Sequence, residues 1–215
     1  MRLTHIPLHL LLALICLGIS LPTNALAFAS GLFGYQQSPQ QDTRVFSQWI
    51  QVLERHLQLN LPEGNCSESR INRCHMRNWL AFLDSVRDLP RNEQIEAVNR
   101  YANRKDYILD IDNYGVEDYW AVPREFLYNN GDCEDYAITK LFSLLWLDFP
   151  VETMRIVVLQ DTNLRIPHAV LAVADKDDIM ILDNQTQEVV SHRNIVHYVP
   201  VYSINEQNWW IHIPN

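Results

Sequence analysis

Cys133 is the residue of this 215-residue chain best placed to act as a nucleophile. It lies in the run Gly131-Asp132-Cys133-Glu134-Asp135, and the following residues, 136–147, are largely apolar with helical spacing. A cysteine in the first turn of a helix lies beside unpaired backbone N–H groups and the positive end of the helix dipole, and both stabilise a thiolate. The sequence therefore predicts a reactive thiol at position 133.

A thiol nucleophile needs a base and a group that orients the base, and the chain offers both in order. His168 begins one predicted strand, and Asp183 ends the next. Because hairpin partners lie side by side, these two side chains are expected at one sheet edge. The hypothesis makes Cys133 the nucleophile, His168 the base and then the acid, and Asp183 the orienting group. Taken singly, each also fits a structural role as a small buried residue, a core histidine and a turn residue.

The elements that must position these residues change from helix to strand along the chain. Residues 28–42 are Gln-rich and are expected to be loosely ordered. A first helix is predicted from Asp42, with one face formed by Val45, Trp49, Val52, Leu53, His56 and Leu57. Further helices are predicted over about 79–86 and about 92–104, and then from Cys133 onward.

The second half of the chain has the composition of short strands. They are predicted at 154–159, 168–173, 179–182, 198–204 and 209–213, with a turn at Asp177-Asp178. The short connections favour an antiparallel meander over alternating parallel units. The predicted class is α+β, with a helical N-terminal part and the Cys133 helix packed on an antiparallel sheet.

Residues 1–27 have the pattern of an export signal. An apolar run from Leu8 to Ile19 follows Arg2, and Ala25-Leu26-Ala27 fits the small-x-small cleavage pattern. The run is shorter than the roughly 20 apolar residues of a comfortable membrane span, although an uncleaved anchor is the alternative. We therefore expect a periplasmic or secreted protein that is cleaved near Ala27 and starts near Phe28.

The mature part is expected to be one domain, residues 28–215, with 28–110 mainly helical and 111–215 forming the catalytic core. Removal of residues 1–27 takes away Arg2 and no acid, so 16 Lys and Arg residues then face 26 Asp and Glu residues. This acidic balance argues against nucleic acid or anionic lipid as a partner, because both require basic patches.

Cysteine usage supports the special status of Cys133. Cys16 leaves with the signal, so three cysteines remain in an oxidising compartment. Cys66 and Cys74 lie close together in a polar stretch, which favours a local disulfide; zinc ligation with His75 is the less favoured alternative, since no fourth ligand lies nearby. A disulfide between the first two leaves Cys133 as a free thiol.

The acidic residues around Cys133 present an electrostatic problem. Asp132, Glu134 and Asp135 raise the pKa of a neighbouring thiol and oppose the helix dipole. A bound calcium ion would neutralise that field, with Asp112, Asp118 and backbone carbonyls as candidates to complete its shell. The alternative is a helix-capping pattern, which explains Asp132 and Asp135 well.

Trp120, just upstream, is interpreted as a core aromatic, with docking of a partner's apolar side chain as the alternative.

Four segments together resemble a known family. They are Tyr119–Phe126, the run GDCEDYAITK at 131–140, His168–Leu171 and Leu182–Asn184, and they are similar to the bacterial transglutaminase-like cysteine proteinases of the LapG type. The resemblance covers roughly residues 40–215. It implies a papain-like, transglutaminase-like fold, a Cys133–His168–Asp183 triad, and calcium held through Asp132 and Glu134.

The resemblance also implies a biological role. Such proteins are periplasmic, calcium-dependent endopeptidases that cut the N-terminal retention module of a large surface adhesin, typically within Ala-Ala-Gly, and so promote biofilm dispersal. Their usual regulator is an inner-membrane cyclic-di-GMP receptor whose periplasmic domain sequesters the protease. Two other functions remain open: a transglutaminase or amidase that uses the same triad, and a non-catalytic, calcium-responsive binding module.

Overall fold

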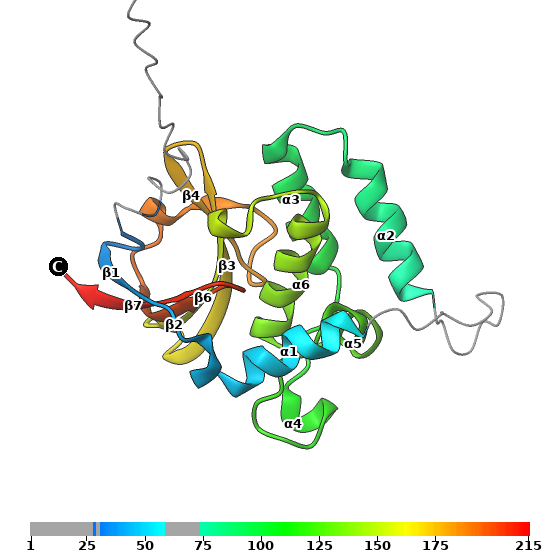
Figure 1. Cartoon of the computed structure of the whole chain (residues 1–215), viewed down its shortest axis with the longest axis horizontal. Coiled ribbons are helices and arrows are strands. Elements are labelled where there is room, and N and C mark those ends of the chain that lie inside the picture. The colour runs from blue at the N-terminus through cyan, green and yellow to red at the C-terminus, as the bar shows by residue number, and fades with distance from the viewer. Residues whose placement is uncertain (1–27, 29–30, 59–73) are drawn as a thin grey trace, which may run out of the picture.

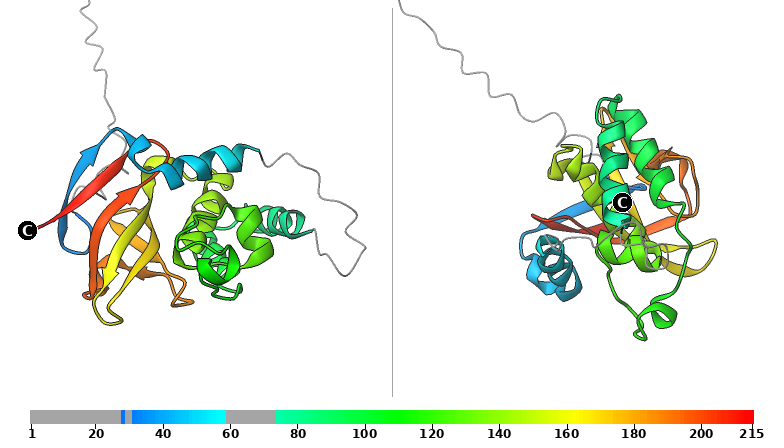
Figure 2. Two further views of the ribbon diagram at one scale, coloured as in Figure 1. Left: turned by 90° about the horizontal axis from the view of Figure 1, so that it is seen from below. Right: turned by 90° about the vertical axis from the view of Figure 1, so that its right-hand side faces the viewer.

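The computed structural model describes residues 28, 31–58 and 74–215, and it has a helical layer packed on one side of a curved sheet (Figures 1 and 2). The helices are α1 (Ser47–Leu57), α2 (His75–Val86), α3 (Arg91–Ala102), α4 (Asp110–Asn113), α5 (Pro123–Asn129) and α6 (Cys133–Trp146), with 3₁₀ turns at Thr43–Val45, Val151–Thr153 and His192–Asn194. The strands are β1 (Tyr35–Gln40), β2 (Met154–Asp161), β3 (Ile166–Asp175), β4 (Asp178–Leu182), β5 (Val190–Ser191), β6 (Tyr198–Ile204) and β7 (Trp209–Pro214). The predicted α+β class with an antiparallel sheet is confirmed.

The sheet has seven strands in the order β1-β7-β6-β2-β3-β4-β5, and each named pair is antiparallel. Strands β2 to β5 form the predicted meander, but β6 then crosses over and pairs with β2. The simple meander is therefore wrong beyond β5. The crossover covers the side of β2 that a meander would leave as an unpaired edge.

Strand β1 corrects the expectation that residues 28–42 are loosely ordered. Tyr35–Gln40 pairs with β7 in a register that joins Tyr35 to Pro214 and Gln40 to Trp209. The strand lies at the edge of the sheet, where backbone hydrogen bonds alone can hold a polar segment and where Pro39 is tolerated. The Gln-rich composition gave no sign of this pairing because the partner lies at the other end of the chain.

Helix α6 lies at the centre of the molecule, between the sheet and α3 (Figure 1). Every residue from Glu134 to Leu144 is buried, so the helix packs on all sides rather than along one stripe. This burial fixes the helix that begins with Cys133 against β2 and β3. Alternate residues of β2 and β3 enter two apolar cores, and the core on the α6 side includes Ile156 and Leu171.

Helix α1 follows the sequence prediction in its middle and departs from it at both ends. Trp49 and Val52 are fully buried, but Val45 is 64% exposed and Leu57 is 80% exposed. Val45 lies in a separate 3₁₀ turn that is capped by Asp42, and α1 begins only at Ser47. Val45 therefore does not share the buried face.

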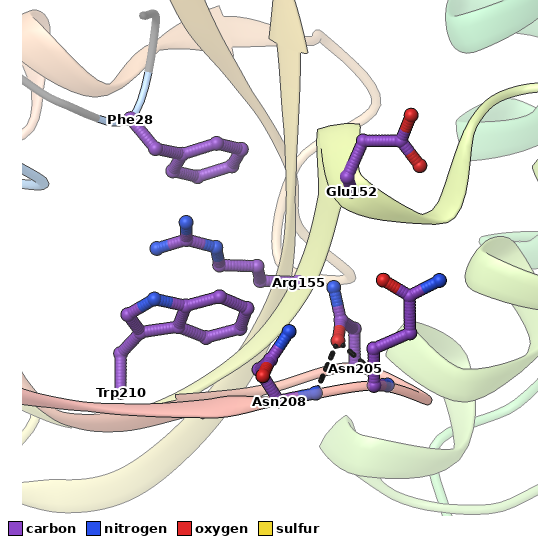
Figure 3. A pocket seen from close by; sticks show the side chains of 7 residues that line it. Phe28, Glu152, Arg155, Asn205, Asn208 and Trp210 are labelled. Atoms are coloured by element: carbon purple, nitrogen blue, oxygen red, sulfur yellow. Dashed lines mark hydrogen bonds between the residues drawn. The ribbon is translucent and has the colours of Figure 1, made fainter. Parts of the chain in front are cut away.

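Phe28 packs on the face of the sheet away from α6, beside Arg155 and Trp210 (Figure 3). The Arg155 guanidinium carbon lies 3.9 Å from the centre of the Phe28 ring and 3.5 Å from that of Trp210, so the cation stacks between two aromatic rings. Gln37 accepts a hydrogen bond from Arg155 and donates one to the Phe28 carbonyl. These contacts, named here the Phe28 clasp, leave a pocket of only about 180 Å³ beside them.

Cys133 is a free thiol, and Cys74 is disulfide-bonded. Cys66, the partner proposed from the sequence, and the export signal lie outside the described residues, so both remain predictions. Among the described helices, none has the length and apolar character needed to cross a membrane.

Candidate active site

The turn before α6 places Cys133 at the first helical position. Helix α5 ends at Asn129, and Asn130 adopts a positive φ of 65°. A Cβ on Gly131 would collide with the carboxylate of Asp135, so only glycine permits this close approach. That carboxylate accepts a hydrogen bond from the Asp132 N–H at 3.3 Å, as in a capping box. The segment before Cys133 thus consists of a short helix and a tight, fixed turn.

Two upstream segments are fixed to this turn. Tyr107 forms a parallel β-bridge with Gly131, and the Ile108 N–H donates to the Gly131 carbonyl at 2.9 Å. The second oxygen of Asp135 accepts from the Ala121 N–H at 2.6 Å. The residues that follow Tyr107 and those that precede α5 therefore lie beside the start of α6.

His168 and Asp183 form a buried hydrogen-bonded pair, with 2.9 Å between His168 Nε2 and Asp183 Oδ1. The β3–β4 register pairs Leu171 with Leu182, which places the residue after β4 near the start of β3. The same carboxylate accepts from the Tyr198 hydroxyl at 2.5 Å. Burial raises the pKa of Asp183, but the hydrogen bond from His168 and the other donors outweigh it, so the net shift is downward. Asp183 is therefore ionised and holds His168 Nε2 in a hydrogen bond.

Cys133 and His168 line the same cleft, which has a volume of about 530 Å³. The backbone of Ala169, next to His168, acts on the thiol and lowers its pKa. Asp183 occupies His168 Nε2, which leaves Nδ1 as the ring nitrogen available to a proton from the thiol. The cleft thus collects the groups needed for acyl transfer: a thiol, an imidazole and, behind it, a carboxylate.

The thiol is not stabilised as a thiolate by its surroundings alone. Burial raises the pKa of Cys133 well above its usual value, and the adjacent carboxylates of Glu134 and Asp132 add to this effect. The Sγ atom lies 3.2 Å from Glu134 Oε2. The expected benefit of the helix N-terminus is therefore outweighed, as the acidic sequence around Cys133 indicated.

Three carboxylates meet beside the thiol. One oxygen from each of Asp110, Asp132 and Glu134 lies within 4.8 Å of the others. Burial raises the pKa of Asp110 to about 6 and that of Glu134 well above its usual value, and repulsion from Asp132 adds to both. Asp110 Oδ1 and Asp132 Oδ1 are buried, and neither has a hydrogen-bond donor among the described residues. Unsatisfied, closely spaced carboxylate oxygens fit the hard-oxygen shell that Ca²⁺ requires.

The structure changes the expected composition of this cluster. Asp112 is exposed and is not a member, whereas Asp110, which the sequence did not single out, is. Asp118 lies close enough to raise the pKa of both Asp110 and Asp132, but it accepts hydrogen bonds from Gln48 and from the Trp120 indole. No pattern in the sequence identifies Asp110, because the Tyr107–Gly131 bridge that brings it in joins distant segments.

Trp120 is 6% exposed and is packed in the core, as expected, although it also lines the cleft. Its docking of a partner side chain stays a prediction. The cleft walls also contain apolar and aromatic residues that the sequence reasoning missed, namely Tyr107, Leu109, Val158, Ile166 and Tyr202.

Comparison with known proteins gives one family. The sequence model described as bacterial transglutaminase-like cysteine proteinase matches residues 66–215. A search among curated proteins gives no significant match. Among solved structures, LapG from Legionella pneumophila aligns at 31% identity with a TM-score of 0.59, covering 65% of this chain and 78% of that one. The calcium-bound form of the same protein aligns at 27% identity with a TM-score of 0.61, covering 75% of this chain and 86% of that one. An EGTA-treated form aligns at 31% identity with a TM-score of 0.59, covering 65% of this chain and 76% of that one.

Proposed function

This chain belongs to the bacterial transglutaminase-like cysteine proteinase family, and we propose that it is a calcium-dependent cysteine endopeptidase with Cys133, His168 and Asp183 as its triad. The main support for this triad is the buried His168–Asp183 hydrogen bond, which lies at a cleft that also contains the free thiol of Cys133. Membership of the family supports cysteine-protease chemistry, and the geometry supports these three residues as the ones that perform it.

The proposed reaction follows from these positions. His168 takes the thiol proton on Nδ1, while Asp183 holds Nε2 and stabilises the imidazolium. The Cys133 sulfur bonds to the peptide carbonyl carbon, and the carbonyl π pair moves to the oxygen. When the tetrahedral adduct collapses, the C–N bond breaks and His168 returns the proton to the leaving amine. Water, activated by His168, then hydrolyses the thioester.

Asp110, Asp132 and Glu134 would hold the calcium ion. When bound, the ion would offset the negative charge that raises the thiol pKa and would fix the loops on either side of the cleft. The calcium-bound form of the Legionella protein supports this assignment.

For the substrate we propose the N-terminal retention module of a large surface adhesin, cut in the periplasm, with release of the adhesin and biofilm dispersal as the outcome. For the regulator we propose the periplasmic domain of an inner-membrane cyclic-di-GMP receptor. Both rest on the resemblance to LapG-type proteins.

The test is to incubate residues 28–215 with exported adhesin N-termini, in calcium or in EGTA, and to map the products by mass spectrometry. We expect a single cut in calcium, none in EGTA, and none with Cys133→Ala, which should keep its circular dichroism spectrum. Cleavage by folded Cys133→Ala would overturn the nucleophile assignment. Incorporation of a labelled amine into a glutamine-containing protein without cleavage would favour a transglutaminase, and retained biological activity in Cys133→Ser would favour a binding module.

A further inference from the structure

Besides His168, three aromatic side chains with hydrogen-bond donors line the cleft: Tyr107, Trp120 and Tyr202. The Trp120 indole N–H is already used, because it donates to Asp118 at 3.0 Å. The Tyr202 ring stacks on Phe46 at 4.6 Å. Tyr107 differs from both, because its backbone bridges Gly131, two residues before Cys133, and its side chain lines the cleft together with Cys133.

The backbone of Tyr107 is fixed relative to the nucleophile. Its bridge to Gly131 joins it to the residue two positions before Cys133, and the Ile108 N–H secures the same carbonyl from the next position. The side chain is 51% exposed at the cleft wall, and its phenol makes no hydrogen bond to any described residue. A donor that lines the same cleft as the thiol, with its proton uncommitted, is available to a group that enters the cleft.

We infer that the Tyr107 hydroxyl is a catalytic oxyanion donor, which acts together with the backbone N–H groups at the first turn of α6; this rests on the proposed endopeptidase function. As the C–S bond forms, the carbonyl π pair becomes a negative oxygen, and the Tyr107 O–H donates a hydrogen bond to it. The phenol keeps its proton throughout, and the hydrogen bond is released when the C–N bond breaks.

The surroundings favour a phenol over a charged donor in this role. Burial raises the pKa of Tyr107, and the negative charges of Cys133, Asp132 and Glu134 raise it further, so the hydroxyl stays protonated at neutral pH. A neutral O–H also adds no cation beside the carboxylates that are proposed to hold calcium. Tyr107 can therefore donate to an oxyanion without competing for the metal ligands.

The first experiment compares Tyr107→Phe with Tyr128→Phe as a matched control, because Tyr128 is 55% exposed on α5 and lies away from the cleft. In calcium, Tyr107→Phe should lower kcat by roughly 10²-fold with KM nearly unchanged, as loss of one oxyanion donor does elsewhere. Tyr128→Phe should match wild type in both. An unchanged kcat, or a change confined to KM, would show that Tyr107 only contributes to substrate binding and would overturn the inference.

The second experiment does not depend on identifying the adhesin. A peptide aldehyde, acetyl-Ala-Ala-glycinal, adds the Cys133 thiol across its C=O bond, and the resulting oxygen lies at the oxyanion position. Iodoacetamide alkylates the same sulfur without forming an oxyanion. Tyr107→Phe should weaken aldehyde binding by at least roughly tenfold and leave the alkylation rate unchanged.

Equal effects of Tyr107→Phe on both reagents, or none on either, would reject the donor role. If wild type binds the aldehyde but cuts no adhesin, the substrate proposal fails while the role of Tyr107 is still decided by the variant.

Discussion

At the scale of single residues, the structure shows one thiol and several carboxylates sharing a small volume. The groups that raise the pKa of Cys133 are also the groups that could bind a divalent cation. A shift in the thiol pKa and metal affinity are therefore linked through the same side chains. Asp110 is the informative member, because it belongs to the cluster but is not adjacent to Cys133 in the sequence.

Asp110→Asn should weaken Ca²⁺ binding by at least roughly tenfold, because one negative ligand is lost from a set of three. Isothermal titration calorimetry with Ca²⁺ measures this directly, without any substrate. Asp112→Asn is the control, since Asp112 lies on the same short helix but outside the cluster. Equal affinity of the two variants would mean that Asp110 is not a ligand.

Lys140 gives a second prediction at this scale. It is fully buried on α6, and its ammonium nitrogen has no hydrogen-bond partner in the described part of the chain. Burial lowers the pKa of Lys140 to about 7, although Asp183 acts in the opposite direction. Between pH 7 and 10.5 the unfolded chain binds a proton that the folded protein has released, so this residue makes stability rise with pH across that window.

Lys140→Met should remove that pH dependence and raise the free energy of unfolding below pH 7, by on the order of 2–5 kcal/mol. Urea unfolding at pH 6 and pH 9 measures both effects. If the variant is less stable at both values, the ammonium contributes a favourable interaction that burial alone does not describe.

At the scale of elements, the loop that carries Asp183 depends on helix α3. The Asn103 side chain donates to the carbonyls of Asp183 and Thr186, both at 2.7 Å, and Asn99 donates to those of Thr186 and Gln187. The helical layer therefore fixes the position of the carboxylate that orients His168. This contact joins the helical layer to the loop that carries Asp183.

Asn103→Ala should lower the free energy of unfolding by about 1–3 kcal/mol, since it removes the side-chain donor to the partly buried Asp183 carbonyl and one of the two side-chain donors to the Thr186 carbonyl. It should also lower kcat more than KM, because the orienting group becomes less well held. Thermal unfolding and steady-state kinetics check the two effects. Normal kcat in a destabilised variant would show that the loop keeps its position without α3.

The sequence predicted the helices and strands whose pattern is local, and it missed those that are too short or that depend on a distant partner. Helices α2, α3 and α6 and strands β2, β3 and β4 were recognisable from the spacing of their apolar residues. Helix α5, which begins at Pro123, was missed because its seven residues are too few to show a period. Strand β1 is polar and owes its conformation to a partner at the far end of the chain.

The same division holds for the site. The order of thiol, imidazole and carboxylate along the chain predicted which residues line the cleft or support it, and the His168–Asp183 contact is present. Asp110 and Tyr107 were not predicted, because they reach the site through a backbone bridge between segments more than twenty residues apart. A single sequence does not reveal such a pairing.

At the scale of the whole molecule, the cleft that contains Cys133 and the Phe28 clasp share no lining residue. They also border different apolar cores, one on each face of the sheet. Phe28 is 4% exposed and packs with Leu32 and Val157 in the core on the side away from α6. Stability and activity should therefore respond separately to changes at the clasp.

Phe28→Ala should lower the free energy of unfolding by about 3 kcal/mol, through lost burial and lost stacking on Arg155. At temperatures well below unfolding, kcat and KM should equal those of wild type. Val196→Ala is the control, because Val196 is 92% exposed. A loss of activity without a loss of stability in Phe28→Ala would show that the two regions are coupled.

The Phe28 clasp has a consequence for the predicted removal of the export signal. Phe28 is the residue expected to follow the signal-peptidase cut, and its side chain is enclosed once the fold is complete. A peptidase must bind extended backbone on both sides of the peptide bond that it hydrolyses. If the predicted export signal is cut before Phe28, the cut should therefore precede the burial of the Phe28 side chain.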